Sequence, residues 1–382
     1  MAEYRFEDIA INSTEKKKPV ESDKEHYLGL EHLDSGTFKV SRFGSEVAPI
    51  GDKLIMKKGD VLFGKRRAYQ KKVAIAPFDG IFSAHGMVLR PKEDVIDKNF
   101  FPLFIASDYF LDAAIKISVG SLSPTINWRD LKELKFNLPE SDEQKKLAEI
   151  LWQIVATMES YKKLLAKTDE MVKAKFVEMF GDPTKFKSEK LSKNVEEMFI
   201  GPFGSDLKNN CFVSKDEAYC IVYEQKHAIS GTITDENRYI TEKKYQQLKR
   251  FTLLPGDIIV SCRGTIGKIF LLPENAPLGI MHPSIMKIRL KKDTYNKKFF
   301  ISLLRNKMDE LINKADGTSV KMAITATKLG NIDFIIPNLT LQNKYVDLLD
   351  RAEESKSAIQ ASLDSLSAVY KKIIAENLGG SN

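Results

Sequence analysis

One stretch of this chain occurs twice, half a chain apart. Residues 139–151 read PESDEQKKLAEIL, and residues 337–349 read PNLTLQNKYVDLL. The two starts, 337 and 139, differ by 198 positions in a chain of 382 residues. Solenoid repeats have periods of roughly 20 to 50 residues. The long offset therefore predicts two copies of one domain, each followed by its own connector.

The match extends beyond these segments. Gly59-Asp60 recurs as Gly256-Asp257, and Arg90 recurs as Arg289. Tyr27 and Gly36 match Tyr219 and Gly231 less securely. The other matched positions are Gly80-Ile81 with Gly279-Ile280, Phe100-Phe101 with Phe299-Phe300, Gly120-Ser121 with Gly317-Thr318, and Leu131, Leu134 and Phe136 with Leu329, Ile332 and Phe334. We interpret the matched positions as framework, and the unmatched basic loops as the parts in which the copies differ.

Each copy is predicted to end in a long helix. Residues 145–180 contain neither Pro nor Gly, and their apolar side chains recur at alternating steps of four and three, a heptad pattern. Burial of each stripe in a local core is one explanation. Two matching helices favour packing against each other, antiparallel if the copies are related by a pseudo-twofold axis. The predicted seams are Leu147, Leu151, Ile154, Met158, Tyr161, Leu165, Thr168, Val172, Lys175 and Met179, and Tyr345, Leu349, Ala352, Lys356, Ile359, Leu363, Leu366, Tyr370, Ile373 and Asn377.

The globular parts mix short β-rich runs with helical patterns, so we predict the α+β class for each. The expected architecture is a pseudo-twofold tandem repeat, in which two long antiparallel coiled-coil helices separate two similar globular domains. The predicted strands are 60–64, 72–76, 81–90, 257–262, 268–272 and 285–290, and the predicted helices of the domains are 101–117 and 297–315. The predicted boundaries are 1–144 and 182–340 for the domains, and 145–181 and 341–382 for the connector helices.

Composition excludes several classes of protein. Hydrophobic residues make up 43% of the chain and charged residues 29%, which is typical of a folded domain. No apolar run approaches the ~20 residues that span a bilayer, and the N-terminus lacks an apolar signal-peptide core. We therefore expect a cytoplasmic chain without a membrane partner. Cys211, Cys220 and Cys262 have no CxxC spacing, which favours free thiols over a disulfide or a zinc site.

A search for catalytic motifs finds none that is specific. GTIGK at 264–268 places its glycines too close together for a phosphate-binding loop. No two prolines are adjacent, which excludes the Asn/Asp-Pro-Pro-aromatic motif of base-methylating enzymes. A helix start explains Glu143-Gln144-Lys145 better than a nuclease half-site does. The five histidines have no metal-ligand spacing. We therefore predict no catalytic residue, no metal and no cofactor in this chain.

Basic and hydroxyl-bearing loops remain as candidates for binding. Residues 57–72 contain seven lysines and arginines against one acid, Asp60. Lysine and arginine suit phosphate contacts, and arginine can also contact guanine through two hydrogen bonds. For any single residue, a solvated surface charge is the alternative explanation. The predicted DNA contacts are Lys65, Arg66, Arg67, Tyr69, Lys71, Lys72, Ser121, Ser123 and Thr125 in the first copy, and Ser205, Lys208, Lys226, Arg263, Thr265, Lys268, Thr318, Ser319 and Lys321 in the second.

Taken together, these features resemble the specificity subunit (HsdS) of Type I restriction-modification systems. The resemblance rests on the two Gly-Asp strands with their basic loops, on GPFGSDLK at 201–208, and on the Gly-Ser/Thr loops that precede the repeated segments. It also rests on the two long helices, which close in Phe180-Gly181 and Leu378-Gly379. One position departs from the family: Leu341-Gln342 stands where Glu-Gln is usual, as in Glu143-Gln144 of the first copy.

The resemblance implies two target recognition domains, each reading one half of a split double-stranded DNA sequence. It implies that the helices set the spacer between the halves and dock two methyltransferase (M) subunits, which restriction/translocase (R) subunits join. S-adenosylmethionine, ATP and Mg are then expected in those partners. The sequence is also compatible with two rival functions. One is a nuclease or methyltransferase with an unrecognised motif, and the other is a coiled-coil scaffold for protein partners without sequence-specific DNA binding.

Overall fold

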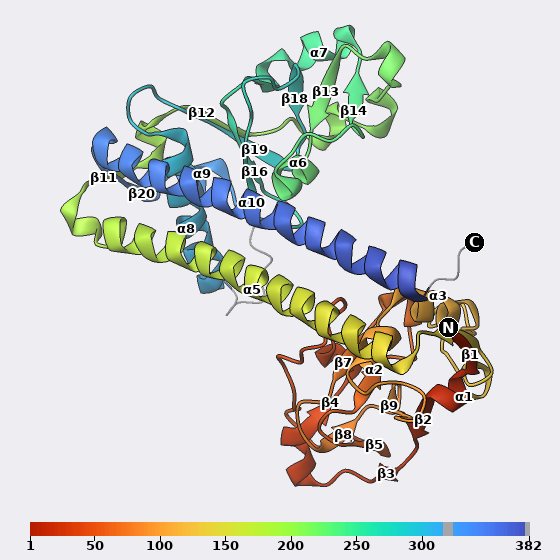
Figure 1. Ribbon diagram of the computed structural model, residues 1–382. Helices are drawn as coiled ribbons and strands as arrows, with labels where there is room; N and C mark the ends of the chain where they lie inside the picture. The colour runs from red at the N-terminus through yellow and green to blue at the C-terminus, as the bar shows by residue number, and fades with distance from the viewer. Residues whose placement is uncertain (316–323, 379–382) are drawn as a thin grey trace. The chain divides into compact units, whose positions relative to one another are not determined.

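The computed structural model describes residues 1–315 and 324–378 (Figure 1); the side chains of 313–315 are not part of the description. The chain divides into two compact units. Unit 1 comprises Met1–Leu165 and Ser357–Asn382, and unit 2 comprises Ala166–Lys356. Each unit holds one globular domain of mixed helix and strand together with parts of both long helices, which confirms the predicted α+β repeat.

The domain of unit 1 is built on two four-stranded sheets. The first is antiparallel, and its order is β2 (Ala10–Ser13), β9 (Met87–Pro91), β6 (Val61–Phe63) and β7 (Val73–Ile75). The second has the order β3 (Lys16–Lys17), β5 (Lys53–Met56), β8 (Gly80–Phe82) and β4 (Tyr27–Leu28), with β4 and β8 parallel. A separate ribbon pairs β1 (Ala2–Arg5) with β10 (Lys135–Leu138). Apolar side chains of the first sheet, such as Phe63 and Leu89, face the main core of the unit.

The helices of this domain are short: α1 (Phe6–Ile9), α2 (Phe100–Ile105), α3 (Asp108–Lys116) and α4 (Trp128–Leu131). The single helix expected over 101–117 is wrong, because the chain breaks into α2 and α3 at Ser107. Ser107 has an extended backbone, and its hydroxyl accepts a hydrogen bond from the Phe110 N–H, as an N-cap residue does. Both helices pack on an aromatic core that includes Phe104 and Phe136.

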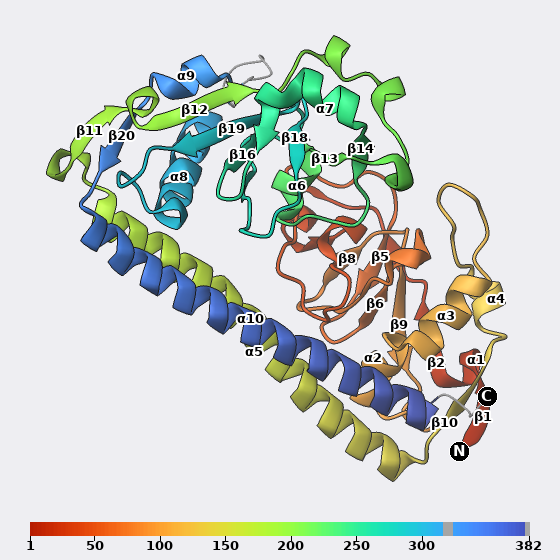
Figure 2. The same cartoon turned by 90° about the horizontal axis from the view of Figure 1, so that it is seen from above.

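Unit 2 repeats this plan. One sheet has the order β12 (Val195–Ile200), β19 (Ile285–Leu290), β16 (Ile258–Ser261) and β17 (Ile269–Leu271). The other has the order β14 (Arg238–Ile240), β13 (Cys220–Tyr223), β18 (Gly279–Met281) and β15 (Thr252–Leu253), and β11 (Lys187–Lys190) pairs with β20 (Asp333–Ile336). The domain also has α6 (Gln225–Ser230), α7 (Glu242–Leu248), α8 (Lys297–Ala315) and α9 (Ala326–Gly330). Figure 2 shows α8 beside the sheet that contains β16 and β19, with which it shares a core.

The recurring Gly-Asp pairs have the same structural role in both units. Arg90 donates two hydrogen bonds to Asp60, at 2.8 and 2.9 Å, and Arg289 donates two to Asp257, both at 2.7 Å. Each aspartate is buried beside a glycine with positive φ, 93° at Gly59 and 82° at Gly256. Such a φ suits glycine, and a buried carboxylate needs a paired charge. The matched residues are therefore framework, as expected.

Strand register also tests the looser part of the repeat. Ile81 and Ile280, which match in sequence, occupy equivalent places on β8 and β18. Tyr27 pairs with Ile81, and Val222 pairs with Ile280, both in parallel register. Tyr27 therefore corresponds to Val222, and the match of Tyr27 with Tyr219 is wrong. Because the chains of the two copies differ most before these strands, sequence similarity alone did not fix the alignment there.

The two long helices are α5 (Ser141–Phe180) and α10 (Leu339–Leu378). Every predicted seam position on both is buried or half-buried, which confirms the heptad interpretation. Within unit 2, Lys356 forms an ion pair with Asp169 at 2.5 Å, and Tyr345 packs on Phe180. From Tyr345 to Lys356 along α10, the contacted residue on α5 moves back from Phe180 to Asp169. Within unit 2 the two helices are therefore antiparallel.

The start of each long helix is fixed by a buried glutamine. The Gln144 side chain accepts a hydrogen bond from the Asp97 N–H at 2.8 Å and donates to the carbonyls of Val95 and Pro139. Gln342 makes the same three bonds, with the Asn296 N–H and the carbonyls of Thr294 and Pro337. The departure at Leu341 therefore leaves this anchor intact, because the glutamine alone makes these bonds.

None of the described helices combines the length and the apolar composition needed to cross a membrane.

Candidate nucleic-acid interface

The basic loop of unit 1, residues 64–72, joins β6 to β7. The Gly64 N–H donates to the Lys72 carbonyl at 2.9 Å and closes the loop. Inside it, a 3₁₀ turn over Ala68–Gln70 lies between two residues with left-handed backbone, Arg67 (φ 54°) and Lys71 (φ 49°). Non-glycine residues adopt this conformation rarely, and they do so where surrounding contacts hold them. The loop is therefore a defined structure.

A second segment, residues 119–125, lies against this loop. We name it the serine hairpin; Val119 and Thr125 pair at its base. The Arg67 N–H donates to the Pro124 carbonyl at 2.7 Å, and the Ile126 N–H donates to the Lys65 carbonyl at 2.9 Å. The Arg67 Nε also lies 3.5 Å from the Ser123 Oγ. Two segments predicted separately to contact DNA are thus brought together by direct hydrogen bonds.

The exposed tips of this assembly are cationic. Arg66, Arg67, Tyr69 and Ser121 are exposed, whereas Lys65, Ser123 and Thr125 are half-buried. Arg66 Nη1 lies 3.3 Å from His85 Nε2. Partial burial and the charges of Arg66 and Lys65 lower the pKa of His85, so this ring favours the neutral form that can accept a hydrogen bond from Arg66. Burial, assisted by the charge of Lys16, likewise lowers the pKa of Lys65.

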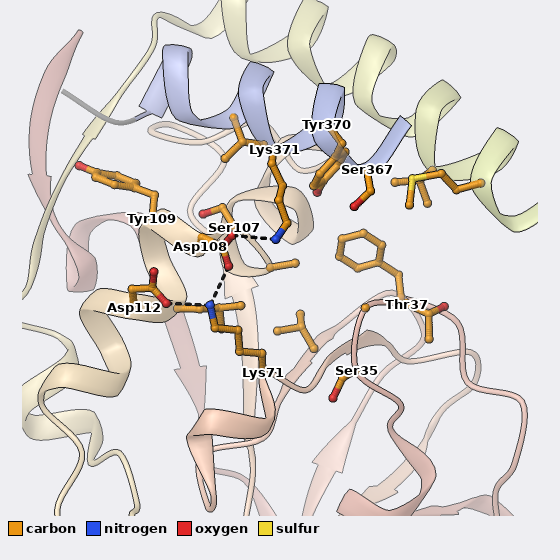
Figure 3. A pocket seen from close by; sticks show the side chains of 18 of the residues that line it. Ser35, Thr37, Lys71, Ser107, Asp108, Tyr109, Asp112, Ser367, Tyr370 and Lys371 are labelled. Atoms are coloured by element: carbon orange, nitrogen blue, oxygen red, sulfur yellow. Dashed lines mark hydrogen bonds and ion pairs between the residues drawn. The ribbon is translucent and has the colours of Figure 1, made fainter. Parts of the chain in front are cut away.

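Two further lysines of the loop that were predicted to contact DNA, Lys71 and Lys72, have partners within the protein. Lys71 Nζ lies 2.7 Å from Asp108 Oδ1 and 2.7 Å from Asp112 Oδ1, on α3 (Figure 3). Lys72 Nζ donates to the Leu30 carbonyl at 2.7 Å. Lys71 also borders a cavity of about 910 Å³ within unit 1, which α3 and the two long helices line. Arg66 and Arg67 are therefore the exposed cations of the loop.

In unit 2 the equivalent loop, residues 262–268, is more compact. Ser261 Oγ donates to the Thr265 carbonyl at 2.6 Å and accepts from the Lys268 N–H at 2.9 Å. Arg263, Thr265 and Lys268 are all exposed. A Cβ atom built on Gly264 would lie 3.5 Å from Gln225 Oε1, so α6 begins beside this loop.

The remaining predicted residues of unit 2 are not gathered in one place. Ser205 and Lys208 are exposed in a segment of short 3₁₀ turns, and among the described residues no hydrogen bond joins them to the 262–268 loop. Lys226, on α6, donates to the Glu236 carbonyl and lies 3.8 Å from Glu224. Thr318, Ser319 and Lys321 lie outside the described residues.

Comparison with known proteins identifies the family of this chain. A family model described as "Type I restriction modification DNA specificity domain" matches residues 5–168 and 193–365, which is most of the chain. The chain belongs to the Type I restriction-modification DNA specificity family. Its two matched segments fall in the two halves of the repeat, and its role is DNA sequence recognition in a Type I system.

Individual relatives of this specificity family agree. The chain is 28% identical over 161 residues to the Escherichia coli "Type I restriction enzyme EcoDI specificity subunit", which is 42% of this chain and 36% of that one. It is 23% identical over 332 residues to the "Putative type I restriction enzyme MjaX specificity subunit" of Methanocaldococcus jannaschii, covering 83% and 76% of the two chains.

Solved structures share the fold. The chain superposes with a TM-score of 0.60 and 16% identity on a chain from a study of "complex assembly and conformational transition of the type I R-M system", with 98% of this chain and 97% of that one covered. It matches the Type I restriction-modification S subunit from M. genitalium with a TM-score of 0.52 and 12% identity, over 100% and 96% of the chains.

Three residues that contact the predicted DNA-binding side chains were not predicted from the sequence. His85 meets Arg66, and Asp108 and Asp112 hold Lys71. Isolated acids and a lone histidine carry no motif, so only the folded chain relates them to the basic loop. Within the described residues, no three His, Cys, Asp or Glu side chains gather as a metal site would require.

Proposed function

We propose that each unit of this chain reads one half of a split double-stranded DNA sequence. The observation that carries the proposal is the junction of the basic loop with the serine hairpin in unit 1, which presents Arg66 and Arg67 on a hydrogen-bonded platform. Arginine can contact phosphates and guanine edges, and hydroxyls can contact phosphates. In unit 2 the loop of Arg263, Thr265 and Lys268 would have the same role.

The long helices fit a spacing and docking role. Forty residues of α-helix rise roughly 60 Å, and half-sites one turn of DNA apart are separated by ~34–36 Å. We propose that the helices set the distance between half-sites and dock two methyltransferase (M) subunits, with restriction/translocase (R) subunits joining them in the cytoplasm. S-adenosylmethionine, ATP and Mg would then belong to those subunits, and this chain would be non-catalytic.

A map of modified adenines in the host genome, with the gene intact and deleted, tests the proposal directly. One split motif should lose its methylation when the gene is deleted, and its two halves are then the two half-sites. Retention of every methylated motif, in a host whose methyltransferase is expressed, contradicts the proposal. A protein-binding scaffold without DNA specificity predicts that outcome.

Removal of both arginines tests the site itself. Arg66→Ala with Arg67→Ala should weaken binding of the assembled methyltransferase complex to target DNA about 100-fold or more, because two bidentate contacts are worth roughly 1–3 kcal/mol each. The variant should tolerate changes in one half-site and remain selective for the other. Binding to DNA with either half-site randomised gives the measurement.

Two controls accompany this variant. Lys162→Ala with Lys163→Ala removes the same charge from helix α5. This variant should remain as selective as the wild-type complex for both half-sites. Arg263→Ala with Lys268→Ala should relax the opposite half-site. Relaxation of the same half-site by both loop variants would refute the assignment of one half-site to each unit.

A further inference from the structure

A chain of charges connects the basic loop of unit 1 to two helices. Lys71 Nζ lies 2.7 Å from a carboxylate oxygen of Asp108 and 2.7 Å from one of Asp112. The other oxygen of Asp108 lies 3.5 Å from Lys371 Nζ on α10. Figure 3 shows Lys71 pointing toward α3 and Lys371 reaching down from α10 to the same carboxylate. Asp108 therefore has a cation on each side.

The charges of this network stabilise one another. The hydrogen bond from Lys71, together with the smaller effect of the Lys371 charge, lowers the pKa of Asp108. Partial burial alone would lower the pKa of Lys71, yet its bonds to Asp108 and Asp112 raise it. Lys71 thus stays charged and bound to α3. Its ammonium group is already paired with two carboxylates and is not available for a phosphate contact.

The position of Lys71 in the loop lets its contacts with α3 restrict the backbone near Arg67. Lys71 has a left-handed backbone, with a φ of 49°, and ends the 3₁₀ turn that Arg67 begins. Its N–H donates to the Ala68 carbonyl at 2.9 Å, while the Arg67 N–H donates to the serine hairpin at 2.7 Å. A side chain fixed at one end of this turn restricts the backbone of the arginine at the other end.

We propose that Asp108 and Asp112 are positioning residues for DNA reading by unit 1: they hold Lys71, and with it the basic loop, against α3, and Asp108 extends this hold to α10 through Lys371. Lys71 is then an anchor of the loop and makes no phosphate contact. The inference rests on the proposed function for its effect on DNA, but the anchoring itself is a property of the free protein.

The proposal predicts an effect of unusual sign. Removal of an acid beside a DNA-binding loop should strengthen DNA binding if only long-range electrostatics act. If the acids position the loop, Asp108→Asn with Asp112→Asn should instead weaken binding to target DNA, by about fivefold, as expected for loss of an exposed ion-pair network. Binding to random DNA should not weaken.

Lys71→Ala separates an anchor from a phosphate contact. Each phosphate contact contributes about −0.9 to the slope of log affinity against log salt concentration. Loss of an anchor should weaken target binding about fivefold and leave this slope unchanged. The triple variant with both asparagines should bind no more weakly than Lys71→Ala, because the three residues act as one unit. A slope reduced by about one unit would overturn the proposal.

Hydrogen exchange of the assembled complex without DNA tests the anchor independently of DNA reading. Amides of residues 64–72 should exchange several-fold faster in the Asp108→Asn, Asp112→Asn variant. Glu93→Gln with Asp94→Asn, which removes two exposed acids of unit 1 between β9 and α2, serves as the matched charge control and should leave the loop unchanged. Unchanged exchange in the loop of the Asp108 and Asp112 variant overturns the proposal. If the wild-type complex shows no salt-dependent DNA binding, the proposed function fails and the anchor is still tested.

Discussion

Strand β9 of unit 1 carries Val88 into the core, whereas strand β19 carries Lys287 at the equivalent place in unit 2. The equivalence follows from the strand register, since each residue lies two positions before the arginine of its Asp–Arg pair. Both side chains are almost completely buried, at 0% and 1% exposure. The same frame therefore holds an apolar residue in one copy and a lysine in the other.

The neighbours explain how unit 2 accommodates the lysine. Lys287 Nζ forms an ion pair with Glu197, donates to the Thr252 carbonyl at 3.1 Å and lies 4.6 Å from the centre of the Phe199 ring. In unit 1 the equivalents of Glu197 and Phe199 on β2 are Ile11 and Ser13. A buried charge is tolerated where paired groups surround it, so these three positions differ together between the copies.

The copies also differ at both edges of the second sheet. Strands β4, β8 and β5 of unit 1 have the same order and directions as β13, β18 and β15 of unit 2. The fourth strand, however, pairs with β5 in unit 1 and with β13 in unit 2. Divergence is thus concentrated at edges and loops, which is consistent with two readers of different half-sites on one frame.

The largest expected effect comes from forcing one unit to resemble the other. Val88→Lys should destabilise unit 1 by about 4 kcal/mol or more, because the ammonium would be buried without a carboxylate partner. Lys287→Met should change the stability of unit 2 by about 1 kcal/mol or less, since Glu197 keeps its bond to Arg289. Hydrogen exchange of the full chain measures both, unit by unit.

A third variant completes this comparison. Val88→Lys combined with Ile11→Glu and Ser13→Phe restores the partners found in unit 2 and should recover part of the lost stability. If Val88→Lys alone is as well tolerated as Lys287→Met, the partners do not explain the buried lysine.

A medium effect is expected where the copies agree. Gln144→Ala and Gln342→Ala should each destabilise their own unit by about 2–3 kcal/mol, because each leaves one N–H and two carbonyls of the preceding segment without their partner. Glu143→Leu imitates the sequence of the second copy and should cost under about 0.5 kcal/mol. Denaturant titration with exchange detection measures the three. Equal losses for Glu143→Leu and Gln144→Ala would contradict the glutamine anchor.

The smallest effect concerns the thiols, all of which lie in unit 2. Burial raises the pKa of Cys220 to about 11 and that of Cys262 to about 12, so neither is a thiolate at pH 8, whereas Cys211 is half-buried. One thiol should react with iodoacetamide at pH 8 in the native chain and three in denaturant. As pH rises above about 9, unit 2 should lose stability because the unfolded thiols ionise first. Rapid reaction of a Cys211→Ser variant would refute this order.

Sequence reasoning succeeded where both copies carry the same residues. The Gly-Asp pairs, their arginines and the helix seams recur in the chain, so their framework role could be predicted before any contact was known. Even the departure at Leu341 left the anchoring Gln342 in register. Repetition can be read from the sequence without knowing any tertiary contact, and it identifies the positions that the fold itself constrains.

The predicted site was harder to read, because its partners are distant in sequence. Lys71 looked like another free cation of the basic loop, yet its partners Asp108 and Asp112 lie 37 and 41 residues further along. Ser107 divides α2 from α3 by a capping bond that an apolar pattern conceals. Tertiary hydrogen bonds and ion pairs decide such positions, and single-residue patterns do not report them.

The two units differ in one more respect, the continuity of their chains. Unit 2 is a single stretch, Ala166–Lys356, whereas the core of unit 1 includes Ile374 and Leu378 from the last turns of α10. During synthesis the domain of unit 1 emerges before that of unit 2, but its core is completed only when Ile374 and Leu378 have left the ribosome. The contiguous second unit can close earlier, so the half made first is finished last.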